Sequence, residues 1–88
     1  MSLLPPAQTP LNQHSLAALE FWLDELGAQK SRQDPCLWVW VMPNWSAHII
    51  MERDELKVTW EKENQLSHCS FSYGLPRRDV QTAISEGP

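Results

Sequence analysis

The chain has 88 residues, of which 42% are hydrophobic, and its formal net charge is −4. A chain of this length fits one small domain. An acidic chain binds polyanions poorly unless its basic residues cluster, and here they gather only at Lys30–Arg32 and at Arg77-Arg78. Apolar runs stay far below the ~20 residues that span a bilayer. We therefore expect no membrane insertion and no extended surface for nucleic acid.

The first 13 residues contain Pro5, Pro6 and Pro10, and they lack the basic and apolar regions of a secretory signal. Because proline fixes φ and removes a backbone donor, residues 1–13 are predicted to form an extended tail. Residues 14–88 are predicted to form a single α+β domain. Three leucines of the tail could dock it on that domain: Leu3, Leu4 and Leu11.

An amphipathic helix is predicted over residues 15–27. Ser15 suits the N-cap, and Gly27 suits the position after the last turn, where φ is positive. Apolar residues at spacings of three and four form one stripe of this helix: Leu16, Leu19, Trp22, Leu23 and Leu26. The following residues, 28–35, are predicted to form a polar loop.

Four strand-like runs and a second helix follow. The runs cover residues 36–42, 46–52, 55–62 and 66–73, and the helix is predicted over 77–86. Alternation of apolar and polar residues is clearest in the third run, as expected of a half-buried strand. The predicted architecture is α-β-β-β-β-α, a four-stranded antiparallel meander with the two helices packed on one face.

Three turns set the register of this sheet. Turns at Asn44, at Arg53-Asp54 and at Glu63-Asn64 predict three pairs: Val41 with Ala47, Ile49 with Val58, and Val58 with Cys69. A one-residue slip would invert a strand, so the common apolar face supports this register. The residues predicted to face the helices are Leu37, Val39, Val41, Ala47, Ile49, Met51, Leu56, Val58, Trp60, Cys69 and Phe71.

The first strand is apolar on both faces, and in this register Trp38 and Trp40 point away from the helices. A sheet covered on one side needs one apolar face. The second apolar face predicts a partner, because such patches often mark interaction sites and tryptophan is enriched at binding hot spots. The alternative is that the proline tail or the last residues cover it. The predicted partner-binding residues are Trp38, Trp40, Met42, Trp45, His48 and Ile50, with Arg77 and Arg78 as a secondary basic patch.

Patterns that indicate chemistry are weak. His48 and His68 fall in one cross-strand row, but the strand of Thr59 separates their backbones by roughly 10 Å, which is long for two ligands of one metal ion. Cys36 and Cys69 lack C-x-x-C spacing, so they indicate a reducing compartment and small buried side chains. We predict no metal site, no cofactor and no enzymatic activity.

The predicted function is that of a small cytoplasmic adaptor, which binds another protein or itself through the face of Trp38 and Trp40. The alternative is a module for single-stranded nucleic acid or RNA that stacks bases on the same aromatic face. The shortage of basic residues disfavours that alternative. A steep loss of affinity with salt would favour it.

The chain also resembles a small uncharacterised family of soluble cyanobacterial proteins, catalogued as a domain of unknown function. The resemblance covers nearly the whole chain, and it implies a phototroph's cytoplasm but no activity. Leu75-Pro76 departs from the family's pattern, which has a small polar helix cap there. The stretches that carry the resemblance are Leu4–Ala7 with Pro10, Leu11 and His14; Leu19 with Trp22, Leu23, Leu26 and Gly27; Trp38; Pro43 with Trp45 and Ala47; Leu56 with Val58; Phe71 with Tyr73; Arg77 with Asp79 and Val80; and Gly87-Pro88.

Overall fold

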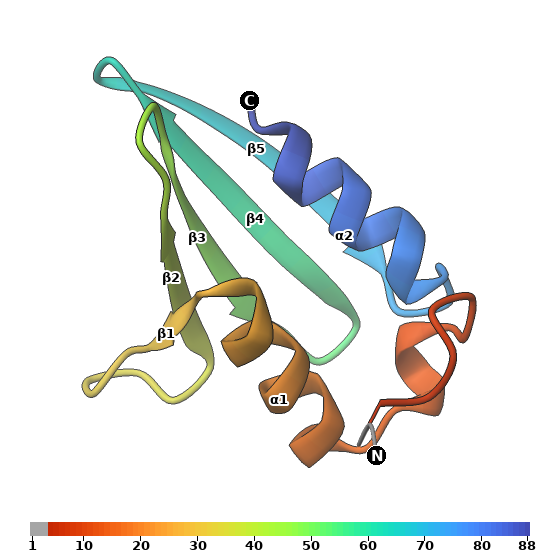
Figure 1. Ribbon diagram of the computed structural model, residues 1–88. Helices are drawn as coiled ribbons and strands as arrows, with labels where there is room; N and C mark the ends of the chain where they lie inside the picture. Colours follow the sequence, from red (N-terminus) through yellow and green to blue (C-terminus); the bar gives the residue numbers. More distant parts are fainter. Residues whose placement is uncertain (1–3) are drawn as a thin grey trace.

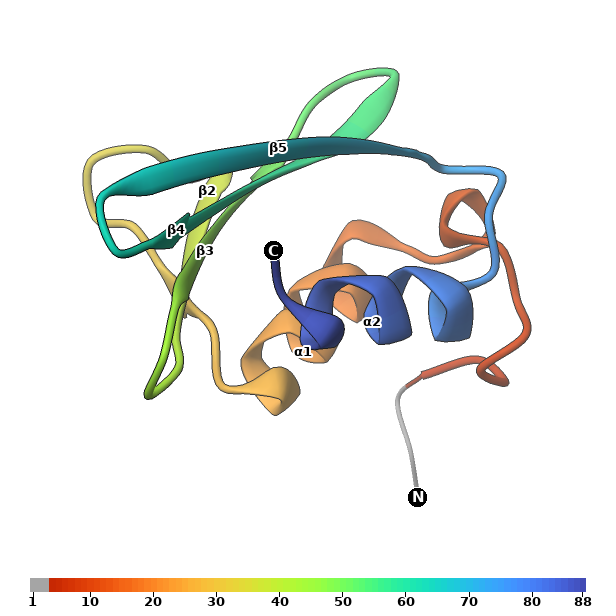
Figure 2. The same cartoon turned by 90° about the horizontal axis from the view of Figure 1, so that it is seen from above.

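In the computed structural model, which describes residues 4–88, two helices lie on the same side of an antiparallel sheet (Figures 1 and 2). The predicted class and the meander are confirmed, because the strands lie in the sheet in chain order. Leu3 lies outside the described residues. The elements are η1 (Leu11–Gln13), α1 (Leu16–Leu26), β1 (Gln29–Lys30), β2 (Leu37–Val41), β3 (Ser46–Met51), β4 (Glu55–Lys62), β5 (Gln65–Ser72) and α2 (Arg77–Glu86).

The sheet has five strands rather than four. The prediction of a loop over residues 28–35 was wrong for β1, in which Gln29 pairs with Val39 and Lys30 pairs with Trp38. Lys30 also donates to Glu20 of α1 at 2.6 Å. This contact ties the short edge strand to the helix layer.

The ends of α1 follow the predicted capping residues. The Ser15 hydroxyl accepts a hydrogen bond from the Ala18 N–H, and Gly27 ends the helix at φ 102°. Leu23 is fully buried, whereas Leu16, which was predicted to lie in the buried stripe, is 64% exposed. Leu16 is the first residue of α1, and Figure 1 shows that the first turn of this helix reaches beyond the ends of the neighbouring strands.

The predicted register of β2 was wrong by one residue. Trp40, not Val41, pairs with Ala47, and Val41 pairs with Ser46. The connecting loop contains four residues, 42–45, and Met42 donates its N–H to the Trp45 carbonyl at 2.8 Å. A turn centred on Asn44, as predicted, would contain an odd number of residues. The even number of residues in the observed loop exchanges the two faces of β2 relative to that prediction.

The inversion places the tryptophans of β2 in the core. Trp38 is 5% exposed and Trp40 is 8% exposed. Burying an indole side chain removes on the order of 200 Å² from water, or about 5 kcal/mol. Among the described residues, the buried Trp38 Nε1 has no hydrogen-bond partner. The cost of leaving one buried N–H unpaired is ~1–3 kcal/mol, which is less than the free energy gained by burying the indole. Burial of the smaller Leu37, Val39 and Val41 would contribute less per position.

The registers of the other two hairpins are confirmed. Ile49 pairs with Val58, and Val58 pairs with Cys69. Glu63 and Asn64 both have positive φ, 51° and 65°, which is the geometry of the tight hairpin turns that match strand twist. The core therefore contains the predicted residues of β3 and β4 except Met51, which is partly buried and packs against it, together with Phe71, Val80 and Ile84.

Both cysteines are exposed, which corrects the prediction that they are buried. Cys36 precedes β2, and its carbonyl accepts from the Met51 N–H. Cys69 lies on the helix side of β5 by its pairing with Val58. Phe71 is the buried residue of β5, whereas residues 65–70 are all exposed.

The N-terminal segment packs against the start of α2 and does not cover the tryptophans of β2. Pro76, the N-cap of α2, has no side-chain acceptor for the free N–H groups of the first turn. The tail supplies acceptors instead, because the N–H groups of Arg77 and Arg78 donate to the carbonyls of Thr9 (3.0 Å) and Ala7 (2.8 Å). Leu11, at the end of this segment, belongs to the buried core.

Candidate functional site

The face of the sheet that points away from α1 and α2 is called here the open face. Figure 2 shows that both helices lie on the other side. Its members follow from the strand pairing, since alternate residues point to opposite faces. They are Leu37, Val39 and Val41 of β2; Ser46, His48 and Ile50 of β3; Lys57, Thr59 and Glu61 of β4; and Leu66, His68 and Ser70 of β5.

One part of the open face is apolar. Val41 is 74% exposed and Leu66 is 61% exposed, while Leu37, Val39 and Ile50 are half-buried. Leu37, Ile50 and Leu66, together with three polar residues, line a shallow depression of about 330 Å³. The sheet thus presents an apolar, slightly hollowed surface that no described element covers.

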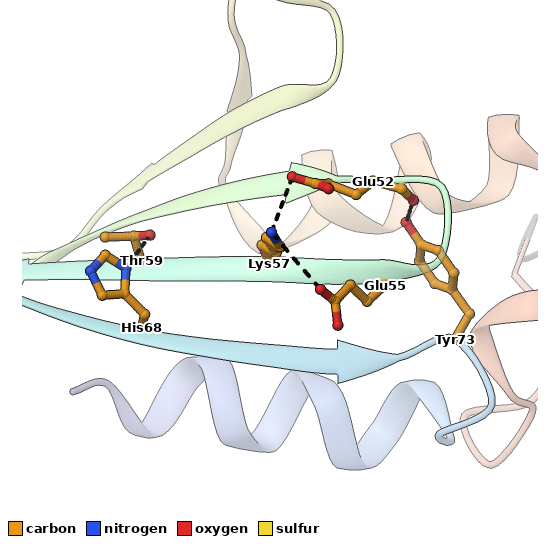
Figure 3. A network of polar contacts seen from close by, with 6 residues as sticks. All are labelled: Glu52, Glu55, Lys57, Thr59, His68 and Tyr73. Carbon is orange, nitrogen blue, oxygen red and sulfur yellow. Dashed lines mark hydrogen bonds and ion pairs between the residues drawn. The ribbon is translucent and has the colours of Figure 1, made fainter.

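The other part of the open face is polar (Figure 3). The Lys57 ammonium lies 3.6 Å from a Glu52 carboxylate oxygen and 3.9 Å from a Glu55 carboxylate oxygen. These groups are half-exposed, so each pair contributes less than ~1 kcal/mol to stability. The one lysine of this part forms ion pairs within the chain, and little positive charge is therefore left to attract a polyanion.

Tyr73 closes the polar end of the sheet (Figure 3). Its hydroxyl donates a hydrogen bond to the Glu52 carbonyl. Burial, followed by electrostatic interactions with Cys36 and with neighbouring carboxylates, raises the pKa of the Tyr73 phenol above its ordinary value. The phenol therefore stays neutral at any ordinary pH and acts as a structural donor rather than a base.

The two histidines of the open face lie on strands that β4 separates. The row that contains them runs Val39, His48, Thr59 and His68. His68 is engaged by a neighbour, because its Nδ1 lies 3.0 Å from the Thr59 hydroxyl. Among residues 4–88, no group of three or more His, Cys, Asp or Glu side chains could hold a metal ion.

The structure divides the predicted partner-binding residues between the core and the open face. Trp38 and Trp40 are buried, and Met42 and Trp45 are partly buried and packed against the core. The prediction that Trp38 and Trp40 lie on an exposed face is therefore wrong, whereas Met42 and Trp45 keep part of their surface exposed. The other two residues, His48 and Ile50, do lie on the open face.

Trp45 has a structural partner at the end of α2. Its ring contacts Trp40 edge to face, with ring centroids 5.6 Å apart. A Cβ atom on Gly87 would lie 2.7 Å from Trp45 Nε1. The indole thus packs directly on a glycine backbone, and a side chain at this position would press on the ring.

The predicted basic patch is also divided. Arg78 is exposed, but Arg77 is buried, and Arg77 Nη1 donates to the Pro5 carbonyl at 2.7 Å and contacts His14 Nε2 at 3.0 Å. Burial lowers the pKa of the Arg77 guanidinium below its ordinary value. Arg77 therefore holds the tail in place and is not available to a ligand.

His14 completes this contact as a neutral ring. Its Nδ1 lies 2.9 Å from the Pro10 carbonyl, which can only accept, so Nδ1 carries the proton. Arg77 can only donate, so His14 Nε2 accepts. The sequence offered one indirect signal for this arrangement, since a proline before α2 leaves the first N–H groups of the helix without a side-chain cap.

Apart from Ile50, the apolar residues of the open face were not predicted to bind a partner. Leu37, Val39 and Val41 were placed under the helices by the one-residue error in β2. Leu66 was placed on the open face but was not predicted to bind a partner. The signal that could have identified them is size, because a strand with tryptophans on one face and valines on the other buries the tryptophans first.

Neither helix of the described chain has the length and apolar character needed to cross a membrane. No curated protein and no solved structure matches this chain. One family of protein domains does match, over residues 26–87, which is more than half of the sequence. The chain belongs to this family, which is described as "Protein of unknown function (DUF3143)".

Proposed function

We propose that this protein is a small non-enzymatic adaptor, and that it binds another protein through the apolar part of its open face. The location proposed for it is a reducing cytoplasm, because two exposed free cysteines fit such a compartment. A cyanobacterial source, which the resemblance implied, belongs to the same proposal.

One observation carries the proposal: apolar side chains from three strands lie together on a face that no described element covers. Single exposed apolar residues are common and need no explanation. Here, however, Leu37, Ile50 and Leu66 line one depression, and Val39 and Val41 continue the apolar surface along β2. Contiguous apolar surface on a small domain is typical of a protein-binding site.

The nucleic-acid alternative has less support than this proposal. Base stacking needs exposed aromatic rings, and both tryptophans of β2 lie in the core. The one lysine of the open face, Lys57, is already paired with Glu52 and Glu55. Few basic side chains of this face therefore remain to bind a phosphate backbone and release its counterions.

The test removes apolar surface while keeping the shape of β2. In the double variant Val39→Thr, Val41→Thr each side chain stays β-branched, so strand propensity is retained. We expect the tagged variant to lose the proteins that the wild type captures from a native extract, as measured by quantitative mass spectrometry. Its free energy of unfolding should change by less than about 1 kcal/mol, because both side chains face solvent at least in part.

A matched control lies on α1. Leu16 is 64% exposed, and Leu16→Gln removes a similar apolar area from the helix layer. We expect this variant to capture the same proteins as the wild type. The proposal fails if the β2 variant keeps its captured proteins, or if both variants lose them equally.

A further inference from the structure

The two edges of the sheet differ in how well they are protected. β1 has two residues, and its Lys30 is tied to Glu20 of α1. β5 has eight residues, Gln65–Ser72, and contains neither proline nor a charged side chain. Charge, proline and short length are the usual protections of an edge strand, so β5 is a long unprotected edge.

The free hydrogen-bonding groups of β5 follow from its hairpin. The loop between β4 and β5 has two residues, so the flanking pair, Lys62 and Gln65, exchanges hydrogen bonds, and every second pair after it does the same. Residues 66, 68 and 70 therefore direct both N–H and C=O away from β4. Among the described residues, these groups have no backbone partner; the one contact there is a weak one, from the Cys69 thiol to the Ser70 carbonyl at 3.9 Å.

We propose that β5 pairs antiparallel with β5 of a second copy, so that two sheets join edge to edge around a two-fold axis at Cys69. His68 of each copy then lies opposite Ser70 of the other, and these two residues exchange both backbone hydrogen bonds. Residues that lie directly opposite each other in the paired strands, such as His68 and Ser70, point to the same face of the sheet. The joined sheet therefore has both open faces on one side and both helix layers on the other.

Self-pairing suits the composition of β5. An uncharged strand brings no like charges opposite each other when it meets its own copy. A histidine opposite a hydroxyl is also a pair that this sheet already contains, since Thr59 and His68 are in contact at 3.0 Å. This inference does not depend on the proposed adaptor function, because it concerns the edge and not the apolar part of the open face.

Cys69 provides a direct probe of the register. On the axis, the two Cys69 residues form a non-hydrogen-bonded pair with Cα atoms about 4.5 Å apart, which lies within the range for a disulfide. In the variant Cys36→Ser, Cys69 is the one remaining cysteine. Mild oxidation with diamide, which takes up the two thiol hydrogens, should link this variant into covalent dimers at concentrations where a denatured sample stays unlinked.

Sedimentation over a concentration series tests the pairing itself. The wild-type chain should pass from 10.2 kDa toward twice that mass. Ser70→Pro removes an N–H that points away from β4, and by symmetry it removes two intermolecular hydrogen bonds, so the dimer dissociation constant should rise roughly tenfold or more. Ser70→Ala keeps that N–H and should form dimers like the wild type.

His68→Lys is a second variant for the case in which proline disturbs the strand. It brings two ammonium groups, one from each copy, close together in the dimer, and the monomer contains no such pair. The variant should therefore dissociate the dimer without lowering the melting temperature of dilute protein. The proposal is overturned if the wild type stays monomeric across the series. It is equally overturned if dimers persist in Ser70→Pro and His68→Lys, or if Cys36→Ser forms dimers that diamide does not link through Cys69.

Discussion

The two faces of β2 are both apolar, yet they have opposite roles in this structure. Trp38 and Trp40 point into the core, while Val39 and Val41 point to solvent on the open face. Hydrophobic character alone does not choose between these orientations. The difference in buried area does, because an indole removes far more apolar surface from water than a valine side chain.

The largest expected effect compares the two faces of β2 directly. Trp40→Ala should lower the free energy of unfolding by about 3–5 kcal/mol, because it leaves a cavity in the core. Val41→Thr, next to it and mostly exposed, should change it by less than about 1 kcal/mol. Urea unfolding of both variants gives the two values. Similar losses for the two positions would mean that β2 is not oriented as described.

A second comparison uses two adjacent arginines. Arg77→Met keeps the apolar stem but leaves the Pro5 carbonyl without its donor, so we expect a loss of about 1–3 kcal/mol. Amide exchange of Leu11 and Asn12, which hydrogen-bond to the Leu75 and Tyr73 carbonyls, should also become faster. Arg78→Met, at an exposed position, should cost less than about 0.5 kcal/mol. Unchanged exchange in Arg77→Met would contradict the role of Arg77 in holding the tail.

A third effect, no larger than the second, concerns Trp45, at the border between core and surface. Gly87→Ala should destabilise the domain by about 1–3 kcal/mol, because φ 83° and ψ −166° lie in a region open essentially to glycine. Its Cβ would also press on the Trp45 ring. Gly74→Ala is the control, since a Cβ there meets the Ser72 hydroxyl at an ordinary 3.5 Å. Equal melting temperatures for the two variants would show that Trp45 does not pack on Gly87.

Local signals were sufficient for most of the fold. Ser15 and Gly27 mark the ends of α1 because each supplies a cap that its neighbours cannot. The alternation around Val58 orients β4, and the turn at Glu63-Asn64 then sets β5. In these elements local propensity and burial favour the same register, so the sequence predicts the structure correctly.

β2 and the tail could not be predicted in the same way. Both faces of β2 are apolar, so its orientation depended on whether the loop to Ala47 has an even or odd number of residues. The position of the tail depends on long-range contacts, such as that of Arg77 with Pro5, which no local pattern indicates. The binding surface was predicted on the wrong face of β2 for the first of these reasons, although a second apolar face was predicted correctly.

The register of β2 against β3 is the central claim, and a proton NOE experiment tests it directly. Met42 and Trp45 flank a two-residue turn and form a hydrogen-bonded pair, so Val39 and His48 form a non-hydrogen-bonded pair. Such pairs bring two Hα atoms close together. We predict strong Hα–Hα cross-peaks between Val39 and His48 and between Val41 and Ser46. Cross-peaks from Val39 to Ile49 and from Val41 to Ala47 would instead place the tryptophans outside and contradict the account.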